Sequence, residues 1–242
     1  MRNNFCLFLT GTISPRKGIN RLKRKHVDVR EEDYFRSIAA WMKLNIPIVF
    51  CENSNYYSKK ISSLFENYSG DGEYLKFQSD SRITEKGRGE TEIFNYCYNN
   101  SKLLGKYQFI IKCTGRFYVE NFSYIIDRIP ADKFCFVYAD LLRNMTWANS
   151  MFFMYDSRFY KEYLTKYLDK IDESNFIYFE HSLARSIHAA MADGYEFSLL
   201  PYPVKFLGYH GSSDERIRND FFRLIKRLIV LRLKRWAFKL AA

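Results

Sequence analysis

The stretch Phe5-Cys-Leu-Phe-Leu-Thr-Gly-Thr12 decides the fold of this chain. Five consecutive apolar residues followed by a Thr-Gly-Thr turn are typical of a parallel strand that is buried on both faces. A second run of this kind, Ile48-Val-Phe-Cys51, ends at Glu52-Asn53. Between the two runs, residues 28–44 carry apolar side chains at helical spacing, with acidic residues in the first turn. The order strand, helix, strand predicts a doubly wound α/β sheet.

The same alternation continues along the chain. We expect further helices over 57–68, 90–104, 157–167 and 179–191, another starting near Asn121, and further strands over 74–78, 107–112, 133–138 and 151–155. A chain of 242 residues fits one core with a short appendage. We therefore predict a Rossmann-like domain over residues 1–213, with a mostly parallel sheet flanked by helices, and a tail over residues 214–242.

The positive charge of the chain is concentrated in this tail. The formal net charge is +11, and from Asp214 onward nine basic residues stand against three acidic ones, a net of +6. Within residues 220–240, basic side chains flank apolar residues that keep helical spacing: Phe222, Ile225, Ile229, Leu233, Trp236 and Leu240. This pattern is typical of a helix lying in the plane of an anionic membrane. The alternative is a terminal helix docked on its own domain or on a partner.

Cysteine usage and the N-terminus favour a cytoplasmic protein. The five cysteines are an odd number, widely spaced and without a Cys-x-x-Cys pair, so we expect reduced, buried thiols. The N-terminal apolar stretch is too short for a signal peptide or a membrane span. With the basic tail, the expected location is peripheral, on the inner face of the cytoplasmic membrane.

Polar or small residues follow four of the predicted strands. They are Thr10-Gly11-Thr12, Glu52-Asn53, Thr114-Gly115-Arg116 and Asp140. Strand ends are commonly polar, but the carboxyl ends of parallel strands meet at one edge of the sheet, where ligands bind. Hydroxyls and backbone N–H groups at residues 10–12 suit a nucleoside, and Glu52 or Asn53 suits a base or ribose. Together these ends predict a nucleotide pocket.

Two glycine-containing segments suit phosphate groups. Lys86-Gly-Arg-Gly-Glu90 places two cations and two flexible glycines just before a predicted helix, whose N-terminus attracts phosphate, although Walker-loop spacing is absent. Gly208-Tyr-His-Gly-Ser-Ser213 carries the imidazole of His210 and the hydroxyls of Ser212 and Ser213 on a loop that could fold over a diphosphate. The alternatives are a mobile basic loop and a plain connector.

Glu180-His181 is expected at the start of a helix. Transfer that inverts an anomeric centre needs a general base for the acceptor hydroxyl, and Glu180 is the first candidate. In a retaining reaction a carboxylate here would instead stabilise positive charge on the sugar. The structural alternative is a helix-start acid beside a packed histidine.

These motifs, in this order, resemble the small bacterial GT-A-type glycosyltransferases of O-antigen and capsule polysaccharide clusters. The resemblance rests on Thr10-Gly-Thr, Glu52-Asn-Ser, Lys86-Gly-Arg-Gly-Glu, Lys112-Cys-Thr-Gly-Arg116 and Glu180-His. It implies a UDP- or GDP-sugar donor, with Thr10, Gly11 and Thr12 lining the nucleotide. It further implies that Glu52 faces the base or ribose and that Lys86 and Arg116 lie near the diphosphate.

The chain departs from that family in its carboxylates. Such enzymes commonly hold Mn²⁺ or Mg²⁺ on the diphosphate with an Asp-x-Asp pair, and this sequence has none. The nearest substitute is Tyr138-Ala-Asp140, so Asp140 is the candidate metal ligand and a second candidate catalytic carboxylate. Alternatively Lys86, Arg88, Lys112 and Arg116 neutralise the leaving diphosphate, and Thr114 beside them is a further candidate binding residue.

The resemblance and the tail together predict sugar transfer from the nucleotide donor to a polyprenyl-diphosphate-linked or lipid-A-linked saccharide at an anionic membrane surface. The competing function is a basic nucleic-acid-binding protein without catalysis. No RNP, KH, helix-turn-helix or zinc signature supports that alternative, so no nucleic-acid partner is expected. A Rossmann oxidoreductase or methyltransferase would need a Gly-rich turn that Gly11 alone does not supply.

Overall fold

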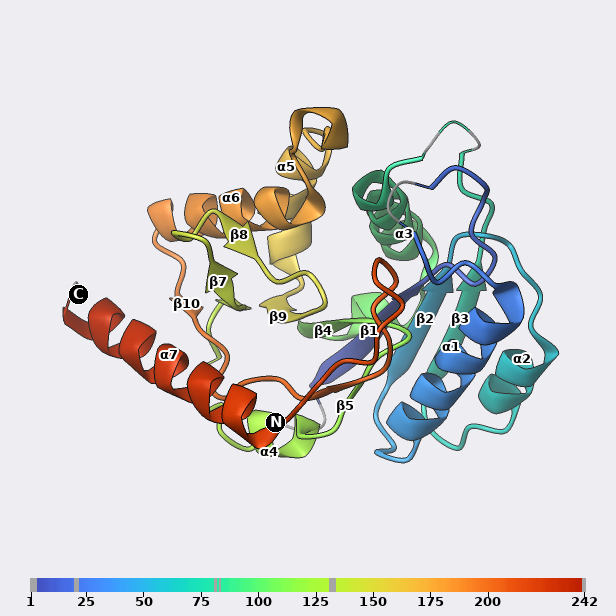
Figure 1. Cartoon of the computed structure of the whole chain (residues 1–242), viewed down its shortest axis with the longest axis horizontal. Helices are drawn as coiled ribbons and strands as arrows, with labels where there is room; N and C mark the ends of the chain where they lie inside the picture. The colour runs from blue at the N-terminus through green and yellow to red at the C-terminus, as the bar shows by residue number, and fades with distance from the viewer. Residues whose placement is uncertain (1–3, 20–21, 81, 83, 131–133, 241–242) are drawn as a thin grey trace.

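A computed structural model of the chain describes residues 4–19, 22–80, 82, 84–130 and 134–240. Its centre is a seven-stranded sheet in the order β10-β6-β9-β4-β1-β2-β3, with helices on both faces (Figure 1). The predicted fold class, a mostly parallel α/β sheet flanked by helices and followed by a C-terminal helix, is confirmed. The predicted strand over 133–138 is short: Lys133 lies outside the described residues, and only Val137–Tyr138 pair with neighbours as β6.

The first half of the chain winds outward from β1 and then reverses. It runs through β1 (Phe5–Gly11), α1 (Val27–Met42), β2 (Ile48–Glu52), α2 (Lys59–Glu66) and β3 (Gly72–Lys76). After α3 (Lys86–Asn100) and a short 3-10 turn (Leu104–Lys106), the chain crosses to the other side of β1 as β4 (Phe109–Thr114). All four strands are parallel, so β1 and β4 form a switch point at which the loops from their carboxyl ends diverge.

The second half completes the sheet with short strands. β9 (Phe152–Asp156) is antiparallel to β4, and β6 and β10 (Phe197–Ser198) extend the sheet beyond it. Two small pairs stand outside the sheet: β5 (Tyr118–Val119) with β11 (Phe206–Leu207), and the hairpin of β7 (Leu141–Leu142) with β8 (Trp147–Ala148). The helical elements of this half are α4 (Phe122–Ile126), a π turn (Tyr160–Leu164), α5 (Thr165–Leu168), a 3-10 turn (Glu173–Asn175) and α6 (Phe179–Ala192).

The core lies on both faces of the sheet, because β1 and β2 are buried along their whole length and largely apolar. Along β1, Cys6 and Phe8 pack on the face covered by α3 and α6, whereas Leu7 and Leu9 pack on the face covered by α1, α2 and α4. Burial on both faces is what the continuous apolar run predicted. All five cysteines are free, and four of them are buried.

The tail forms one helix, α7 (Phe221–Leu240), at the edge of the molecule farthest from α1 and α2 (Figure 1). One side of this helix docks on the domain. Leu231 is buried, Lys234 Nζ donates a hydrogen bond to Leu141 O at 2.6 Å, and Arg235 donates to the carbonyls of Leu199 and Leu200. In the described part of the chain, no helix combines the length and apolar composition needed to cross a membrane.

Candidate functional site

A cavity of about 390 Å³ opens at the carboxyl ends of β1 and β4, at the switch point of the sheet. Residues 10–12 at the end of β1 and residues 114 and 116 at the end of β4 line it from below. The start of α3, the start of α6 and the loop around His210 form its walls. A doubly wound sheet places its ligand at this position, because the diverging loops leave a crevice there. We take this cavity as the candidate functional site.

A chain of polar contacts forms the floor of the cavity. Lys112, fully buried in β4, pairs with the carboxylate of Glu90 and donates to Ser150 O at 2.6 Å. The same Glu90 oxygen accepts a hydrogen bond from Thr10 Oγ1 at 3.0 Å. Ser150 Oγ in turn donates to Glu180 Oε1 at 2.7 Å. The charge of Lys112 is therefore neutralised by a partner inside the protein. Its contacts order the segments that contain Glu90 and Glu180.

Glu180 lies in the first turn of α6 and lines the cavity. Burial raises the pKa of this carboxyl above its ordinary value, and the hydrogen bond from Ser150 opposes the rise. A carboxylate with a raised pKa is better matched to proton transfer near neutral pH than an ordinary one. The structure thus places Glu180 in the cavity, and its role as a general base stays a prediction.

Two guanidinium groups give the opposite wall its positive charge. Arg30 is 3% exposed and donates to Thr12 O at 2.8 Å and Arg24 O at 3.0 Å. Arg116 follows β4 and donates to Tyr209 O at 3.1 Å. Among the described residues, neither forms an ion pair with a carboxylate. Burial lowers the pKa of Arg30, and the nearby Arg116 lowers it further. Two cations without counterions at one cavity favour an anionic ligand.

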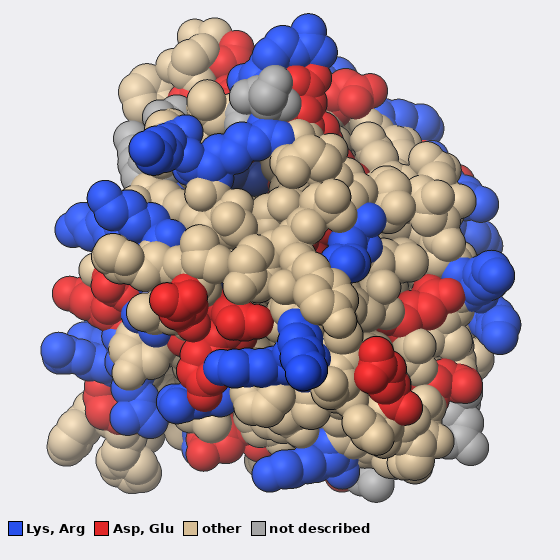
Figure 2. Space-filling model, turned by 90° about the vertical axis from the view of Figure 1, so that its right-hand side faces the viewer, with Lys and Arg blue, Asp and Glu red and all other residues tan. Residues whose placement is uncertain are grey.

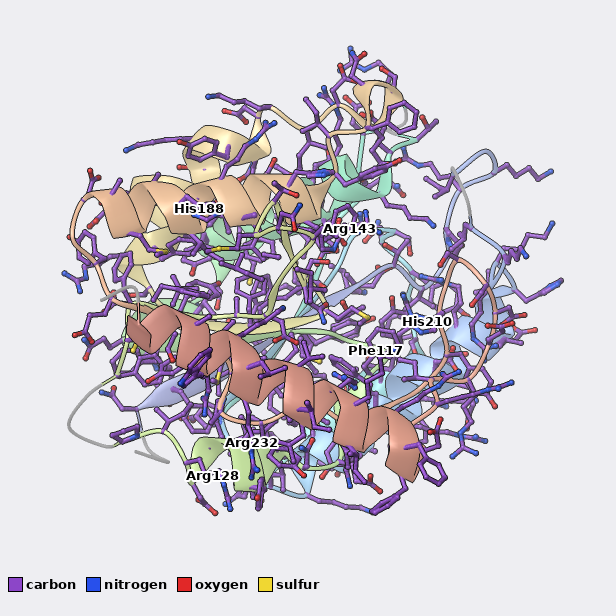
Figure 3. The ribbon with its side chains drawn as sticks, turned by 60° about the vertical axis from the view of Figure 1, so that its left-hand side comes forward. Phe117, Arg128, Arg143, His188, His210 and Arg232 are labelled. Carbon is purple, nitrogen blue, oxygen red and sulfur yellow. The ribbon has the colours of Figure 1, made fainter. Side chains whose placement is uncertain are left out.

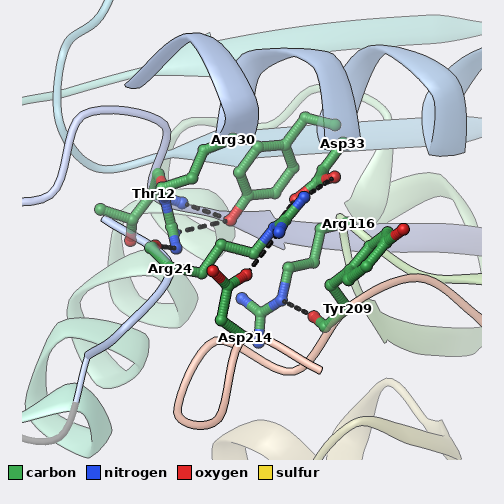
Figure 4. Close-up of polar contacts among 8 residues, drawn as sticks. Thr12, Arg24, Arg30, Asp33, Arg116, Tyr209 and Asp214 are labelled. Carbon is green, nitrogen blue, oxygen red and sulfur yellow. Dashed lines mark hydrogen bonds and ion pairs between the residues drawn. The ribbon is translucent and has the colours of Figure 1, made fainter. Parts of the chain in front are cut away.

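Arg24 joins the two loops at the mouth of the cavity (Figure 4). Its guanidinium pairs with Asp33 of α1 and with Asp214, and it lies 4.2 Å from the ring centre of Tyr209. The backbone N–H groups of Lys23 and Arg24 both donate to Gly211 O. The loop after β1 is thereby fixed to the loop of residues 208–214. His210 and Ser212 line the cavity from this loop. Burial lowers the pKa of His210, which favours neutral imidazole.

An aromatic wall lies beside Glu180. Trp147, Tyr178 and Phe179 line the cavity. The Trp147 ring meets the His181 ring edge-on, with centres 4.9 Å apart, and the Tyr178 ring at 5.8 Å. His181 Nδ1 accepts a hydrogen bond from Tyr178 N, which fixes the start of α6. The cavity thus has one cationic wall and one wall of aromatic rings with a carboxylate.

The loop after β1 offers a ligand fewer free hydrogen-bonding groups than its composition suggested. The N–H groups of Thr12, Ile13 and Ser14 already donate to Tyr34, Glu52 and Ser54. Thr12 Oγ1 donates to Asn53 Oδ1 at 2.6 Å. These bonds fix the loop, so what Thr10, Gly11 and Thr12 present to the cavity is a rigid surface with few free N–H groups.

Several candidate residues lie elsewhere. Glu52 is fully buried, and its carboxylate accepts from the N–H groups of Ile13, Ser54 and Tyr56, so it organises loops below the cavity and does not face a base or ribose. Thr114 lines the cavity, whereas Lys112 lies beneath it and Ser213 lies outside its lining.

The start of α3 is only partly open to a phosphate. Gly87 N donates to Glu173 Oε1 at 2.8 Å, and Glu173 N donates to Glu85 Oε1 at 2.8 Å. A protein carboxylate therefore occupies the N–H group of the second helical residue, where the sequence suggested phosphate. Lys86 lines the cavity from this position.

Asp140 is outside the cavity and faces the tail. Burial raises its pKa, while Arg227 and Lys234 of α7 lower it, so its electrostatic partners belong to that helix. Within the described residues, no group of three or more His, Cys, Asp or Glu side chains has the geometry of a metal site. Glu90, the cavity carboxylate nearest β1, is already paired with Lys112. The donor set therefore does not fit the metal that the resemblance implied, and we derive no step through one.

The amino-acid sequence alone does not identify the residues whose role depends on a distant partner. These are Glu90, Arg30, Ser150, Trp147 and Glu173. Lys112 indicated that such a partner exists, because a lysine within the apolar run Phe109-Ile-Ile-Lys-Cys requires a buried partner of opposite charge. The sequence does not say which acidic residue supplies it.

Gly11 lets the end of β1 approach β2 closely. A Cβ at this position would lie 2.5 Å from Phe50 Cε2. We predict that Gly11→Ala lowers the free energy of unfolding by about 1–3 kcal/mol, because the buried ring must move. Urea denaturation measures this. Gly105→Ala is the control, since a Cβ there meets nothing within 4 Å. Equal stability of the two variants would contradict the prediction.

Comparison with known proteins gives matches in structure only. No protein-family model matches the chain, and no curated protein matches its sequence. Many solved structures are similar to it, among them the following three. One is a glycosyltransferase involved in glycosylation of the major capsid of PBCV-1, with 7% identity, a TM-score of 0.46 and coverage of 80% of each chain.

The other two are nucleotide-sugar or nucleotide enzymes by name. A nucleoside-diphosphate-sugar pyrophosphorylase from Vibrio cholerae RC9 has 9% identity, a TM-score of 0.47 and coverage of 80% of this chain and 90% of its own. A cytidylyltransferase from Leptospira borgpetersenii has 10% identity, a TM-score of 0.45 and coverage of 83% of this chain and 77% of its own. Likeness at this level assigns no activity to the chain, so function has to be argued from the cavity itself.

Proposed function

We propose that the chain is a glycosyltransferase that takes a sugar from a nucleoside diphosphate donor. The observation that carries this proposal is the two-sided cavity at the β1/β4 switch point. Arg30 and Arg116, which form no ion pair among the described residues, supply positive charge on one wall, and Glu180 supplies a carboxylate with a raised pKa on the other. Sugar transfer needs both, since a diphosphate anion leaves on one side of the sugar and an acceptor loses a proton on the other.

The proposed step is a direct displacement. Glu180 removes the proton from an acceptor hydroxyl, and that oxygen forms a bond to the anomeric carbon. The bond from this carbon to the diphosphate oxygen breaks, and the nucleoside diphosphate leaves with the electron pair. Arg116 and the neutral imidazole of His210 stabilise the developing charge with hydrogen bonds. The Arg24 contacts hold the loop that carries His210 over the leaving group.

A thermal-shift screen tests the donor side of this proposal. UDP, GDP and dTDP are added with and without Mn²⁺, beside S-adenosylmethionine and a single-stranded RNA. A fitting nucleotide at a hundredfold excess over Kd stabilises the fold by about 2.7 kcal/mol, or about 5–10 °C. We expect one diphosphate to give this shift and Arg116→Gln to reduce it. A response to RNA alone would instead support nucleic-acid binding.

Arg128→Gln is the matched control for this screen. Arg116 lies over the ring of Phe117, and Arg128 lies in the same way over the ring of Tyr124. Arg128, however, is beside α4 and outside the cavity lining (Figure 3). Its variant should bind the nucleotide as the unchanged protein does. Equal loss in both variants would mean that the effect of Arg116 is not specific to the cavity.

We further propose that the acceptor is a lipid-linked saccharide and that α7 holds the enzyme on an anionic bilayer. The face of α7 opposite the docked Leu231 exposes a stripe of Phe222, Ile225, Ile229, Leu233 and Trp236. We call this set the apolar stripe. Arg223 and Lys226 border it on one side and Arg232 on the other, at 100° per residue.

Charge complementarity selects an anionic bilayer as the occupant of the apolar stripe. Helix α7 contains no acidic residue, whereas Lys and Arg are interspersed with Asp and Glu on the face shown in Figure 2. Apolar side chains between two rows of cations match acyl chains below a layer of negative headgroups. A peripheral location at the cytoplasmic membrane follows from the same proposal.

Replacing Leu233 and Trp236 with serine is expected to weaken vesicle binding about a hundredfold. The two side chains are 59% and 64% exposed, and burying each in lipid contributes about 1.5 kcal/mol or more. Co-sedimentation with vesicles containing phosphatidylglycerol measures the change. Tyr57→Ser is the control, because Tyr57 is 65% exposed but belongs to the loop before α2. Unchanged binding, or a dimer formed through the stripe without vesicle binding, would refute the membrane proposal.

A further inference from the structure

The aromatic wall beside Glu180 contains Trp147, a side chain that neither donor binding nor proton transfer explains. Trp147 is half-buried, lines the cavity, and donates no indole hydrogen bond within the described residues. Aromatic rings with a free polar edge suit ligands that are apolar on one face and polar at the rim. A sugar ring is such a ligand, with C–H groups on its faces and hydroxyls around it.

Arg143 lies outside the cavity lining and adds a positive charge beside Trp147. Its guanidinium carbon lies 4.3 Å from the ring centre of Trp147, and among the described residues it forms no ion pair. The side chain is exposed, and it lies beside the end of α6 that points toward His210 (Figure 3). A stacked guanidinium keeps its N–H groups at the ring edge, where they can donate to an anion next to a bound sugar.

The hairpin that presents these residues is held in an uncommon conformation. Arg143, Asn144 and Met145 are three consecutive residues with positive φ, at 50°, 55° and 67°. Non-glycine residues in this region cost conformational energy and persist where the surrounding structure holds them, often at ligand sites. Met145 O is held by the ring of His188, at 2.9 Å from Nε2. The turn is thereby fixed to α6, which also carries Glu180.

We infer that Trp147 and Arg143 form the acceptor subsite, which binds a sugar ring on the indole and an anionic group of the same molecule on the guanidinium. The acceptor class is therefore a saccharide with a negative charge next to the reacting sugar, supplied by a phosphate or a carboxylate. This inference rests on the proposed function, because the subsite gains its meaning from Glu180 and from a donor on the cationic wall.

Intrinsic fluorescence provides the test. The chain has three tryptophans, of which Trp41 is fully buried and Trp236 lies on α7, so Trp236→Phe leaves Trp147 as the responsive one. This variant is titrated with sugar 1-phosphates, the matching uronic acids and neutral methyl glycosides, with UDP, GDP or dTDP present. We expect emission changes with the charged sugars, and the phosphate and carboxylate series show which anion is preferred.

Two further variants assign the contacts. Arg143→Gln should weaken binding of the charged sugar tenfold or more and leave the neutral glycoside unchanged, whereas Arg128→Gln should alter neither. Trp147→Ala in the full chain should abolish the emission change while the nucleotide still raises the melting temperature. No response to any sugar in a protein that binds nucleotide would overturn the acceptor subsite and leave the proposed function standing. A response to sugar in a protein that binds no nucleotide would overturn the proposed function and leave a sugar subsite standing.

Discussion

Replacing Glu180 with glutamine is expected to lower the rate of sugar transfer about 10²–10⁴-fold, because an amide cannot accept the proton of the acceptor hydroxyl. Glutamine has the same shape and keeps an oxygen for the hydrogen bond from Ser150, so the fold and the donor site should be unchanged. The measurement is the rate of donor consumption with a lipid-linked saccharide fraction, beside the nucleotide affinity. Normal turnover in this variant would remove Glu180 from the reaction.

The pH profile tests the same role independently. Burial raises the pKa of Glu180, and the base acts only when it is ionised. The rate should therefore fall as the pH drops through a value above the ordinary range of a glutamate. Ser150→Ala removes the hydrogen bond that lowers this pKa, so it should move the acidic limb to still higher pH. A shift to lower pH, or no shift, would contradict the assignment.

Replacing Lys112 with methionine is expected to lower the free energy of unfolding by about 3 kcal/mol. Lys112 is fully buried, and its loss leaves Glu90 charged and Ser150 O without its donor. Urea denaturation measures the loss. Adding Glu90→Gln should restore part of the stability, since the unpaired charge is then removed.

Lys60→Met is the matched control. Lys60 pairs with Glu32 on the surface, and an exposed pair of this kind contributes about 0–1 kcal/mol. A loss for Lys112→Met no larger than this would show that Lys112 is not tied into the floor of the cavity.

The sequence was most informative where one segment determines its own structure. Continuous apolar runs predicted β1 and β2, and helical spacing predicted α1, α6 and α7, because burial on both faces and amphipathic periodicity are local properties. The reversed direction of β9 was not predicted. Residues 151–155 are apolar in either direction, and only pairing with Lys112 and its neighbours in β4 sets the direction.

The candidate site was predictable in place and only partly in detail. Polar residues at the carboxyl ends of β1 and β4 pointed to the edge of the sheet where the cavity lies. Residue type alone could not tell a side chain that faces the cavity, such as Glu180, from one that turns inward to cap a loop, such as Glu52. Nor could it show that Asp140 faces α7. These distinctions depend on segments 30 or more residues apart, brought together only by the fold.

Identifying the products of donor turnover tests the central claim most directly. The protein is incubated with UDP-, GDP- and dTDP-sugars, with and without lipid-linked saccharides, and the released nucleotides are separated. We predict that one donor yields its nucleoside diphosphate and a transferred sugar, and that Glu180→Gln suppresses both. Release of pyrophosphate or of a sugar phosphate would mean that the cavity performs nucleotidyl chemistry, and consumption of no donor would contradict the glycosyltransferase proposal altogether.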